Sequence, residues 1–580
     1  MLVIVTLVAP ASLATQRAAV DVEWIARSNA YANILLRVMA RLAPESSADR
    51  GVEGLDEAVT DISSGYEARA IAAYRSAIEE LRKAMAAESH PQVRQDLAIM
   101  IETADGAIAG TELGLKYSIP YVNVASTVFN GLRSLLDDQV AADRRQAALV
   151  RLRKYAGLEP GTTPYTELAV TLIRGRMAKP GLGFPIRSQI EQGLADGKPF
   201  IDGLPALFDK YGVTGYQQPL AALRKQLETY DAFVRAELLP RSRTDFRQPP
   251  DVYAYVLKRV GVDISAAELT TLAHTAFSDI QQELQALAPK VAAQRGWPMR
   301  DYREVIRELK KEQLVGDAIL PHYQARLKEL ETIITREKLA TVPVRPARIR
   351  LATAAETAAS PAPNMRAPRL IGNTGEQGEF VLPLNVPTTD GRTLQTDDFT
   401  FAAASWTLTA HEARPGHEMQ FAGMLEAGVS TTRALFAFNS TNVEGWGLYA
   451  ERIVLPFMPP EGQLISLQHR LLRAARAFLD PELQSGTITI GEAMRVLTQE
   501  VMVSEAMARQ EVDRYTFRSP GQATSYFYGY TRLLQLRADV EAKMGATFNQ
   551  QAFHDFVLSQ GLLPPALMRE AVMTGFVQRK

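Results

Sequence analysis

Two histidines and a glutamate within one short window are the residues of this chain best suited to chemistry. His411 and Glu412 are adjacent, His417 follows six residues after His411, and the chain has only seven histidines. A second cluster, with the sequence EGWGLYAE, begins at Glu444 and ends at Glu451. Two imidazoles, one carboxylate ligand and one spare carboxylate are the components of a catalytic zinc site. The pattern therefore favours a metal-dependent hydrolase.

The spacing of the two histidines departs from the common HExxH arrangement. In that arrangement the histidines are one helical turn apart and share a face. A separation of six residues places them roughly 120° apart on an ideal helix, so an unbroken helix would not direct both imidazoles at one ion. Pro415 and Gly416 lie between them, and these residues disrupt a helix and permit unusual dihedrals. We predict a bulge or broken turn at 414–416 that returns His417 to the face of His411.

The acidic residues of the two clusters receive different roles. Glu412 is expected to lie beside the metal and to act as the general base and proton shuttle. Glu444 is the predicted third ligand, because EGWGLYAE is compact, glycine-rich and helical in character. Glu451, on nearly the same face, is the competing ligand or a hydrogen-bond partner for a histidine. The predicted site is one Zn²⁺ ion on His411, His417 and Glu444, with other divalent ions as alternatives.

The composition excludes several other classes of site. Lys plus Arg number 64 and Asp plus Glu 65, so nothing points to nucleic acid or an anionic membrane as a partner. The absence of cysteine excludes disulfides, a catalytic thiol and cysteine-ligated metal. There is no GxSxG motif and no lysine-containing phosphate loop, so a serine hydrolase and a nucleotide enzyme are poorly supported.

The first residues, MLVIVTLVAPASLATQ, form an apolar run followed by small residues. Residues 12–14 (Ser-Leu-Ala) resemble a signal-peptidase site, although no basic residue precedes the run. We predict that 1–14 is a trimmed signal peptide and that the protein is periplasmic or secreted; the alternative is a buried first segment in a cytoplasmic protein. No other apolar run approaches the roughly 18 residues that span a bilayer, so the mature protein is expected not to enter a membrane.

Helical patterning dominates residues 15–340, which we predict to form an N-terminal helical half. Apolar residues recur at helical spacing with charges between them. The clearest examples are Tyr66–Glu88, Gln218–Leu238 and Ser265–Arg295, and breaks are expected at the Pro- and Gly-rich segments Gly157–Pro164, Pro180–Pro185 and Pro240–Pro250.

The pattern changes in the C-terminal half, 341–580, which carries the metal motifs. β-branched residues near its start and the run Phe380–Leu384 predict a small sheet within 341–395, with 358–368 as an extended loop. Helical patterning resumes near Phe401. We therefore expect a mainly α, multi-helical fold with a small β-sheet beside the active-site helix. An edge strand there would hold an extended substrate by main-chain hydrogen bonds.

The motifs HExxPGHxxQ (411–420) and EGWGLYxE (444–451) resemble the DUF885 family of bacterial proteins, regarded as distant relatives of gluzincin metallopeptidases such as the carboxypeptidase Taq and oligoendopeptidase groups. The resemblance covers nearly the whole chain. Further similarities lie at 43–46, 51–54, 361–365, 372–376 and 520–523. The resemblance implies one continuous, largely helical domain that encloses a deep channel with the zinc at its floor. It does not fix the substrate.

The C-terminal residues supply candidates for the remaining roles. A tyrosine hydroxyl near the zinc would stabilise the oxyanion, as in related gluzincins; Tyr526 is the first choice and Tyr528 the second, with aromatic packing as the alternative. His554 is expected either to donate to the oxyanion or to pack in the core. Arg537 is expected either to bind a substrate carboxylate or to form a helix salt bridge. The other four histidines are expected to be structural: His90, His274, His322 and His469.

The favoured function is a zinc metallopeptidase that cleaves small peptides, with Glu412 as the general base. A deep channel would favour oligopeptides or free C-termini over folded proteins. The alternatives are a zinc amidohydrolase of non-peptide substrates and a non-catalytic peptide-binding protein; a binding protein has no need of Glu412. The sequence leaves open the substrate, endo- or exo-cleavage, the identity of the metal, the oligomeric state and the pathway.

Overall fold

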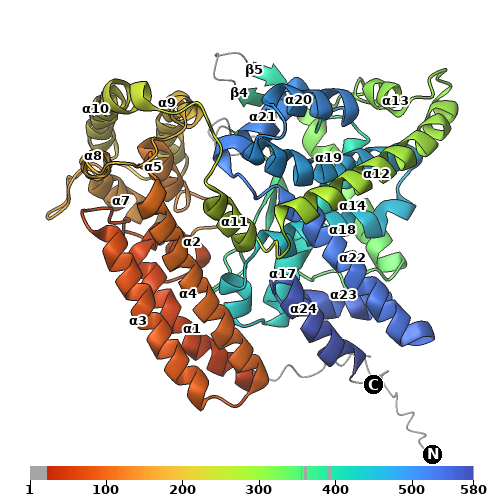
Figure 1. Ribbon diagram of the computed structural model, residues 1–580, viewed down its shortest axis with the longest axis horizontal. Helices are drawn as coiled ribbons and strands as arrows, with labels where there is room; N and C mark the ends of the chain where they lie inside the picture. The colour runs from red at the N-terminus through yellow and green to blue at the C-terminus, as the bar shows by residue number, and fades with distance from the viewer. Residues whose placement is uncertain are drawn as a thin grey trace, which may run out of the picture.

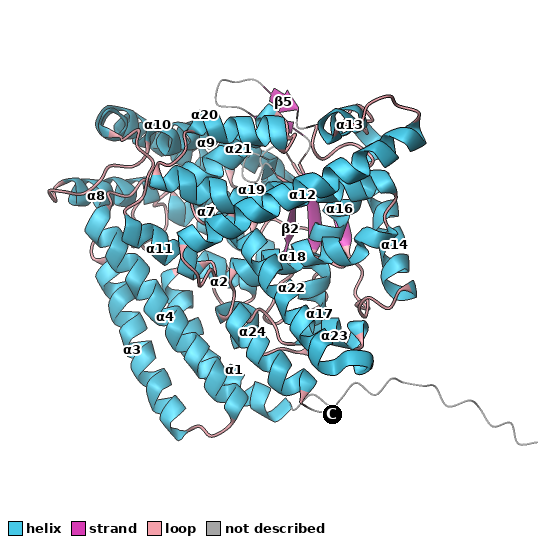
Figure 2. Ribbon diagram, turned by 45° about the vertical axis from the view of Figure 1, so that its right-hand side comes forward, coloured by secondary structure: helices cyan, strands magenta, loops and turns pink. Residues whose placement is uncertain are grey.

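The fold is mainly α, as predicted, with a small sheet among the helices (Figures 1 and 2). The computed structural model describes residues 22–353, 356–357, 362–383, 385–387, 393–395 and 397–578, so the predicted signal peptide lies outside the described residues. None of the described helices combines the length and hydropathy needed to cross a bilayer.

The N-terminal half forms two groups of helices, both at the left of Figure 1. The first group is α1 (Val22–Leu42), α2 (Pro44–Arg50), α3 (Tyr66–Ala87) and α4 (Pro91–Tyr117). The second is α5 (Val124–Arg133), α6 (Ala142–Arg145), α7 (Ala147–Tyr155), α8 (Tyr165–Met177), α9 (Arg187–Lys210) and α10 (Gln217–Phe233). The second group has a core of its own, built from apolar side chains between Ile62 and Leu238.

Four helices then lead to the sheet: α11 (Pro250–Arg259), α12 (Ala266–Arg295), α13 (Tyr302–Leu309) and α14 (Ile319–Arg336). Helix α12 follows the predicted segment because Ser265 and Glu268 form a capping box at its start. The Ser265 hydroxyl accepts from the Glu268 amide at 3.2 Å, and the Glu268 carboxylate accepts from the Ser265 amide at 3.0 Å. The predicted helices beginning at 66, 218 and 265 are all confirmed.

The sheet has three described strands in the order β1-β3-β2: β1 (Arg348–Leu351), β2 (Asn364–Arg366) and β3 (Glu379–Leu382). Strand β1 runs parallel to β3, with Ile349 opposite Phe380, and β2 runs antiparallel, with Met365 opposite Phe380. Strands β4 (Asn385–Pro387) and β5 (Thr393–Gln395) form a separate antiparallel pair. The strand at 380 is confirmed, but the prediction of an extended loop over 358–368 is wrong at β2, which pairs with β3.

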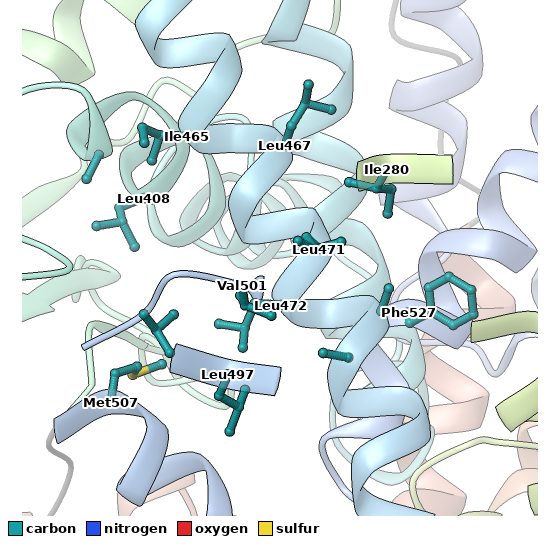
Figure 3. Packing of buried hydrophobic residues seen from close by; sticks show 14 of the residues in the cluster. Ile280, Leu408, Ile465, Leu467, Leu471, Leu472, Leu497, Val501, Met507 and Phe527 are labelled. Carbon is teal, nitrogen blue, oxygen red and sulfur yellow. The ribbon is translucent and has the colours of Figure 1, made fainter. Parts of the chain in front are cut away.

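The C-terminal helices surround one buried helix. They are α16 (Ala404–Glu412), α17 (His417–Ala427), α18 (Ser440–Val454), α19 (Pro460–Ser485), α20 (Ile490–Arg495), α21 (Glu505–Asp513), α22 (Thr524–Met544), α23 (Gln550–Ser559) and α24 (Pro565–Val572). Helix α19 is buried over most of its length. Figure 3 shows Leu471 and Leu472 of α19 in one cluster with Ile280 of α12, Leu408 of α16 and Phe527 of α22. Helix α19 therefore shares one core with the helices that carry the candidate site.

Helices α18 and α22 touch backbone to backbone at a pair of glycines. A Cβ on Gly445 would lie 2.5 Å from the carbonyl carbon of Gly529, and a Cβ on Gly529 would lie 2.0 Å from the carbonyl oxygen of Thr441. Only residues without a side chain allow this approach. A second core combines side chains of α1, α3, α4 and α14 with those of α16, α17, α18, α22, α23 and α24, so both predicted halves contribute to it.

Candidate metal centre

The helix that carries His411 breaks before His417, as the spacing predicted. Helix α16 ends at Glu412 and α17 begins at His417. Between them Ala413 has φ −103° and ψ −103°, and Gly416 has φ −77° and ψ −134°. The Arg414–Pro415 peptide bond is cis.

Buried polar contacts hold this break in place. The Arg414 guanidinium is 2% exposed and donates to Glu418 at 2.6 Å and to Glu331 of α14 at 2.7 Å. The indole Nε1 of Trp446 donates to the Pro415 carbonyl at 2.9 Å. At Gly416 a Cβ would lie 1.9 Å from the His411 carbonyl oxygen, so glycine is required there.

The break directs both imidazoles at one carboxylate oxygen. Glu444 Oε2, from α18, lies 3.4 Å from His411 Nε2 and 3.2 Å from His417 Nε2. The three ligand atoms lie within 4.8 Å of one another. Ligands at 2.0–2.2 Å around a tetrahedral zinc ion are about 3.3–3.5 Å apart, which matches both separations. These residues therefore fit a divalent cation in donor type and in spacing.

Gly447 completes the cradle around the imidazoles. A Cβ at this position would lie 2.7 Å from His411 Cε1, 2.8 Å from His417 Cε1 and 2.9 Å from His411 Nε2. Helix α18 thus supplies both a carboxylate and the space in which the two rings meet. The glycine-rich character of EGWGLYAE serves two close approaches, because Gly445 allows the contact with α22 and Gly447 allows the contact with the rings.

Glu451 supports a histidine and does not face both rings. Its carboxylate accepts a hydrogen bond from His411 Nδ1 at 2.8 Å and another from the Thr407 hydroxyl. This contact engages Nδ1 while Nε2 is directed at Glu444, which is the usual arrangement behind a metal-bound imidazole. The alternative of Glu451 as the third ligand is therefore not supported, and Glu444 occupies that position. Within the described part of the chain, the buried Nδ1 of His417 has no hydrogen-bond partner.

The charges of the cluster reinforce one another. Burial lowers the pKa of His411, but hydrogen bonds with Glu444 and Glu451 outweigh it and raise this pKa to about 9. Burial opposes ionisation of Glu444, yet the two imidazoles hold its pKa well below its usual value. Burial likewise acts on Glu451, but Arg473 and His411 lower its pKa to about 2. Two carboxylates are thus ionised beside the two imidazoles, and a bound cation would take the place of the proton that these carboxylates stabilise on His411.

Glu412 and Tyr526 line a small cavity next to His411. The cavity has a volume of about 70 Å³ and lies between the start of β2, α16, α19, α21 and α22. Burial raises the pKa of Glu412, against the lowering effect of His411 and His417. The Tyr526 ring stacks on the His411 ring with a centroid separation of 6.1 Å, and burial raises its pKa. A carboxylate that can take a proton and a hydroxyl that can donate one therefore share the cavity.

Four cationic or potentially cationic side chains line the same cavity and were not predicted as site residues: His469, Arg473, Arg476 and Arg514. His469, expected to be structural, lies here; burial and the charge of Arg473 lower its pKa to about 3, so it is neutral. The one available signal was the run HRLLRAARAF at 469–478, in which arginines recur every three residues among apolar ones. That pattern is also typical of a solvated helix face.

Three predicted site residues have other partners, and the expectation of a site role is corrected for each. The Tyr528 hydroxyl donates to Asp263. His554 is buried between the Tyr449 hydroxyl, at 2.7 Å, and the Leu339 carbonyl, at 2.6 Å. Arg537 donates to Glu541, Tyr449 and Gln550. None of the three lines the cavity beside Glu412. The alternatives of core packing for His554 and a helix salt bridge for Arg537 hold.

A larger cavity of about 350 Å³ lies between α17, α18, α22, α23 and α24. Its lining mixes apolar side chains with polar and charged ones, and it contains neither imidazole of the cluster nor Glu412. The smaller cavity, which contains both His411 and Glu412, is therefore the candidate site. The deep channel implied by the family resemblance stays a prediction.

Comparisons with known proteins agree with this fold. The family described as "Bacterial protein of unknown function (DUF885)" matches residues 44–572. A solved structure titled "putative lipoprotein from Colwellia psychrerythraea" is 18% identical, with a TM-score of 0.75, 95% of this chain and 99% of that chain being covered. A structure titled "putative lipoprotein of unknown function from Shewanella oneidensis" is 18% identical over the same shares of the two chains, with a TM-score of 0.70. No curated protein matches the chain.

Proposed function

We propose the function from the site itself, because the chain belongs to the DUF885 family of bacterial proteins of unknown function. The proposed activity is that of a metal-dependent hydrolase, and more specifically of a zinc metallopeptidase distantly related to gluzincins that cleaves small peptides. The observation that carries the proposal is the convergence of His411 Nε2 and His417 Nε2 on one oxygen of Glu444, at 3.4 and 3.2 Å, with Glu412 beside them.

The donor set supports zinc, which suits two imidazoles and one carboxylate. Bound there, zinc supplies Lewis acidity that polarises a carbonyl and makes water more acidic. His411, His417 and Glu444 would hold the ion, and Glu451 fixes the ring of His411 by accepting from its Nδ1. The same three ligands also bind other divalent ions, so the donor set favours zinc without excluding them.

Glu412 and Tyr526 supply the proton transfers and charge stabilisation of a hydrolysis. Glu412 accepts a proton from the attacking water and passes it to the leaving amine as the carbon–nitrogen bond breaks. Burial raises the pKa of Glu412 toward neutral pH, and a general base with such a pKa can both accept and release a proton during the reaction. The Tyr526 hydroxyl donates to the developing oxyanion. Arg514 Nη2 donates to the Tyr526 oxygen at 3.0 Å and so orients the hydroxyl.

The test is Glu412→Gln, which removes the base and keeps the size of the side chain. We expect the variant to bind zinc as the unsubstituted protein does and to lose roughly 10²- to 10⁴-fold in kcat. Glu505→Gln, at an exposed position of α21, is the matched control and should retain full activity. Metal content is measured by elemental analysis, and hydrolysis of a peptide library by mass spectrometry before and after chelation. Undiminished hydrolysis by Glu412→Gln would refute the mechanism.

We also propose that the protein works outside the cytoplasm. The similar structures are described as putative lipoproteins, and the first 14 residues resemble a signal peptide. Cell fractionation followed by N-terminal sequencing tests this location. A mature protein that retains Met1 and stays in the cytoplasmic fraction would contradict it.

A further inference from the structure

We propose that Arg473 of α19 binds a carboxylate of the substrate. The substrate class would then be short peptides with a carboxylate next to the scissile bond, from a free C-terminus or from an acidic side chain. This inference rests on the proposed function and deepens it. It starts from the unequal use of the three arginines that line the cavity beside His411 and Glu412.

Two of the three guanidinium groups are already committed to protein partners. Arg476 makes a two-pronged contact with Glu511, with both hydrogen bonds at 2.7 Å. Arg514 donates to Gln522 and, at 3.0 Å, to the Tyr526 hydroxyl. These contacts use the paired N–H groups with which an arginine would grip a carboxylate.

Arg473 is buried with most of its donors unused. Its side chain is 7% exposed, and its Nε has no hydrogen-bond partner among the described residues. Its Nη1 donates to the His469 carbonyl at 3.2 Å, and its Nη2 lies 3.6 Å from Glu451 Oε1, which is an ion pair without a hydrogen bond. A guanidinium carries five N–H groups, so this one retains donors for a ligand. A buried guanidinium with unmet donors is costly unless something binds it.

Glu451 does not substitute for that ligand. One of its oxygens accepts from His411 Nδ1 at 2.8 Å and the other from the Thr407 hydroxyl. Two further acids line the cavity: Glu412 is the proposed base, and Asp398 pairs with Lys310 at 2.6 Å. Each of these three carboxylates therefore has a partner or a role other than binding Arg473.

The cavity places Arg473 close to the proposed reaction centre. His411, Glu412, Arg473 and Tyr526 line the same 70 Å³, and the Arg473 guanidinium lies 6.0 Å from the Tyr526 ring centroid. A space of this size holds several waters or one small polar group. A carboxylate bound there would belong to a substrate residue next to the scissile bond, either as its free C-terminus or as its side chain. The observations therefore favour small acidic substrates over neutral internal segments.

The experiment measures binding without turnover, in the zinc-loaded Glu412→Gln protein, by calorimetry. The three probes are N-acetyl-alanyl-alanine with a free C-terminus, its C-terminal amide, and the amide of N-acetyl-alanyl-aspartate, whose only carboxylate is on the side chain. We expect one of the carboxylate probes to bind roughly 10- to 100-fold more tightly than the neutral amide. Which of the two binds identifies the source of the carboxylate.

Variants assign the preference to Arg473. Arg473→Gln should abolish it and Arg473→Lys should retain part of it. Arg470→Gln, one turn away on α19, buried and not lining the cavity, should leave it intact. Equal binding of all three probes, or an unchanged preference in Arg473→Gln with normal zinc content and circular dichroism, would overturn the inference. If the carboxylate preference is found but the unsubstituted protein hydrolyses no peptide, the proposed peptidase activity is refuted and the role of Arg473 in binding is not.

Discussion

Gly447→Ala adds one methyl group where α18 passes the two imidazoles. The new Cβ would lie 2.7 to 2.9 Å from atoms of His411 and His417. Ordinary contacts of this kind begin at 3.4 Å, so both rings, or the helix that carries the methyl group, must move by about 0.6 to 0.7 Å. Metal–ligand distances tolerate only about ±0.2 Å. The substitution is therefore expected to weaken metal binding before it unfolds the protein.

The size of the effect follows from the cost of overpacking, which is about 1–3 kcal/mol. If that cost falls on the metal complex, zinc binding weakens roughly 5- to 150-fold. The assay is competition for zinc with a chromophoric chelator, together with the increase in Tm that zinc produces. Gly423→Ala on α17 is the matched control, because its Cβ meets nothing within 4 Å. Unchanged zinc affinity in Gly447→Ala, measured beside this control, would refute the geometry derived for the site.

Three further predictions concern the same region. Glu451→Gln should weaken zinc binding roughly 10- to 100-fold by the same competition assay, because it removes the anionic partner of His411 Nδ1; equal affinity would contradict the supporting role. The pKa of His411 is raised to about 9, so zinc must displace a proton from this ring, and zinc affinity should rise roughly tenfold per pH unit between pH 7 and 9 and then level off. Calorimetry in buffers of different ionisation enthalpy should detect the released proton. If no proton is released, His411 is already neutral and the prediction is wrong. Glu511→Gln should lower the free energy of unfolding by about 3–5 kcal/mol, since it leaves buried Arg476 unpaired. The pKa of Glu511 is lowered from 4.5 to about 2, so its stabilisation is complete above about pH 4.5 and is lost as the pH falls toward 2; denaturant titrations at pH 7 and pH 3 that give the same difference between variant and parent would refute this reasoning.

Local patterns predicted the helices that have one solvated face. The segments at 66–88 and 265–295 were identified because their apolar residues recur at helical spacing, and the capping box at Ser265 sets the start of α12. Strand β2 was missed, because its three residues are ordered by pairing with β3, which is a contact made over a distance in the sequence. A short segment without alternation carries no signal of its own.

The cluster of His411, His417 and Glu444 was predictable because histidine is rare in this chain and the three residues lie in two short motifs. The need for a break between His411 and His417 follows from helix geometry alone, and Pro415 and Gly416 mark its place. The rest of the site was not predictable in this way. Arg473 becomes a cavity residue only because α19 is buried on all sides, and that burial depends on α12, α16 and α22. Tyr526 and Tyr528 are two residues apart on one helix, and only the packing of α22 decides which of them faces His411.

The glycine pair at Gly445 and Gly529 has a consequence for how the protein could diversify. Glu444 lies on α18 and Tyr526 on α22, and these two helices meet with no side chain between them. The separation of the two residues is therefore set by contact between the two backbones. Substitutions among the surrounding apolar residues would leave this separation nearly unchanged. A single methyl group on Gly445 or Gly529 would force the two helices apart. The separation of Glu444 and Tyr526 is in this sense insulated from changes in the surrounding core.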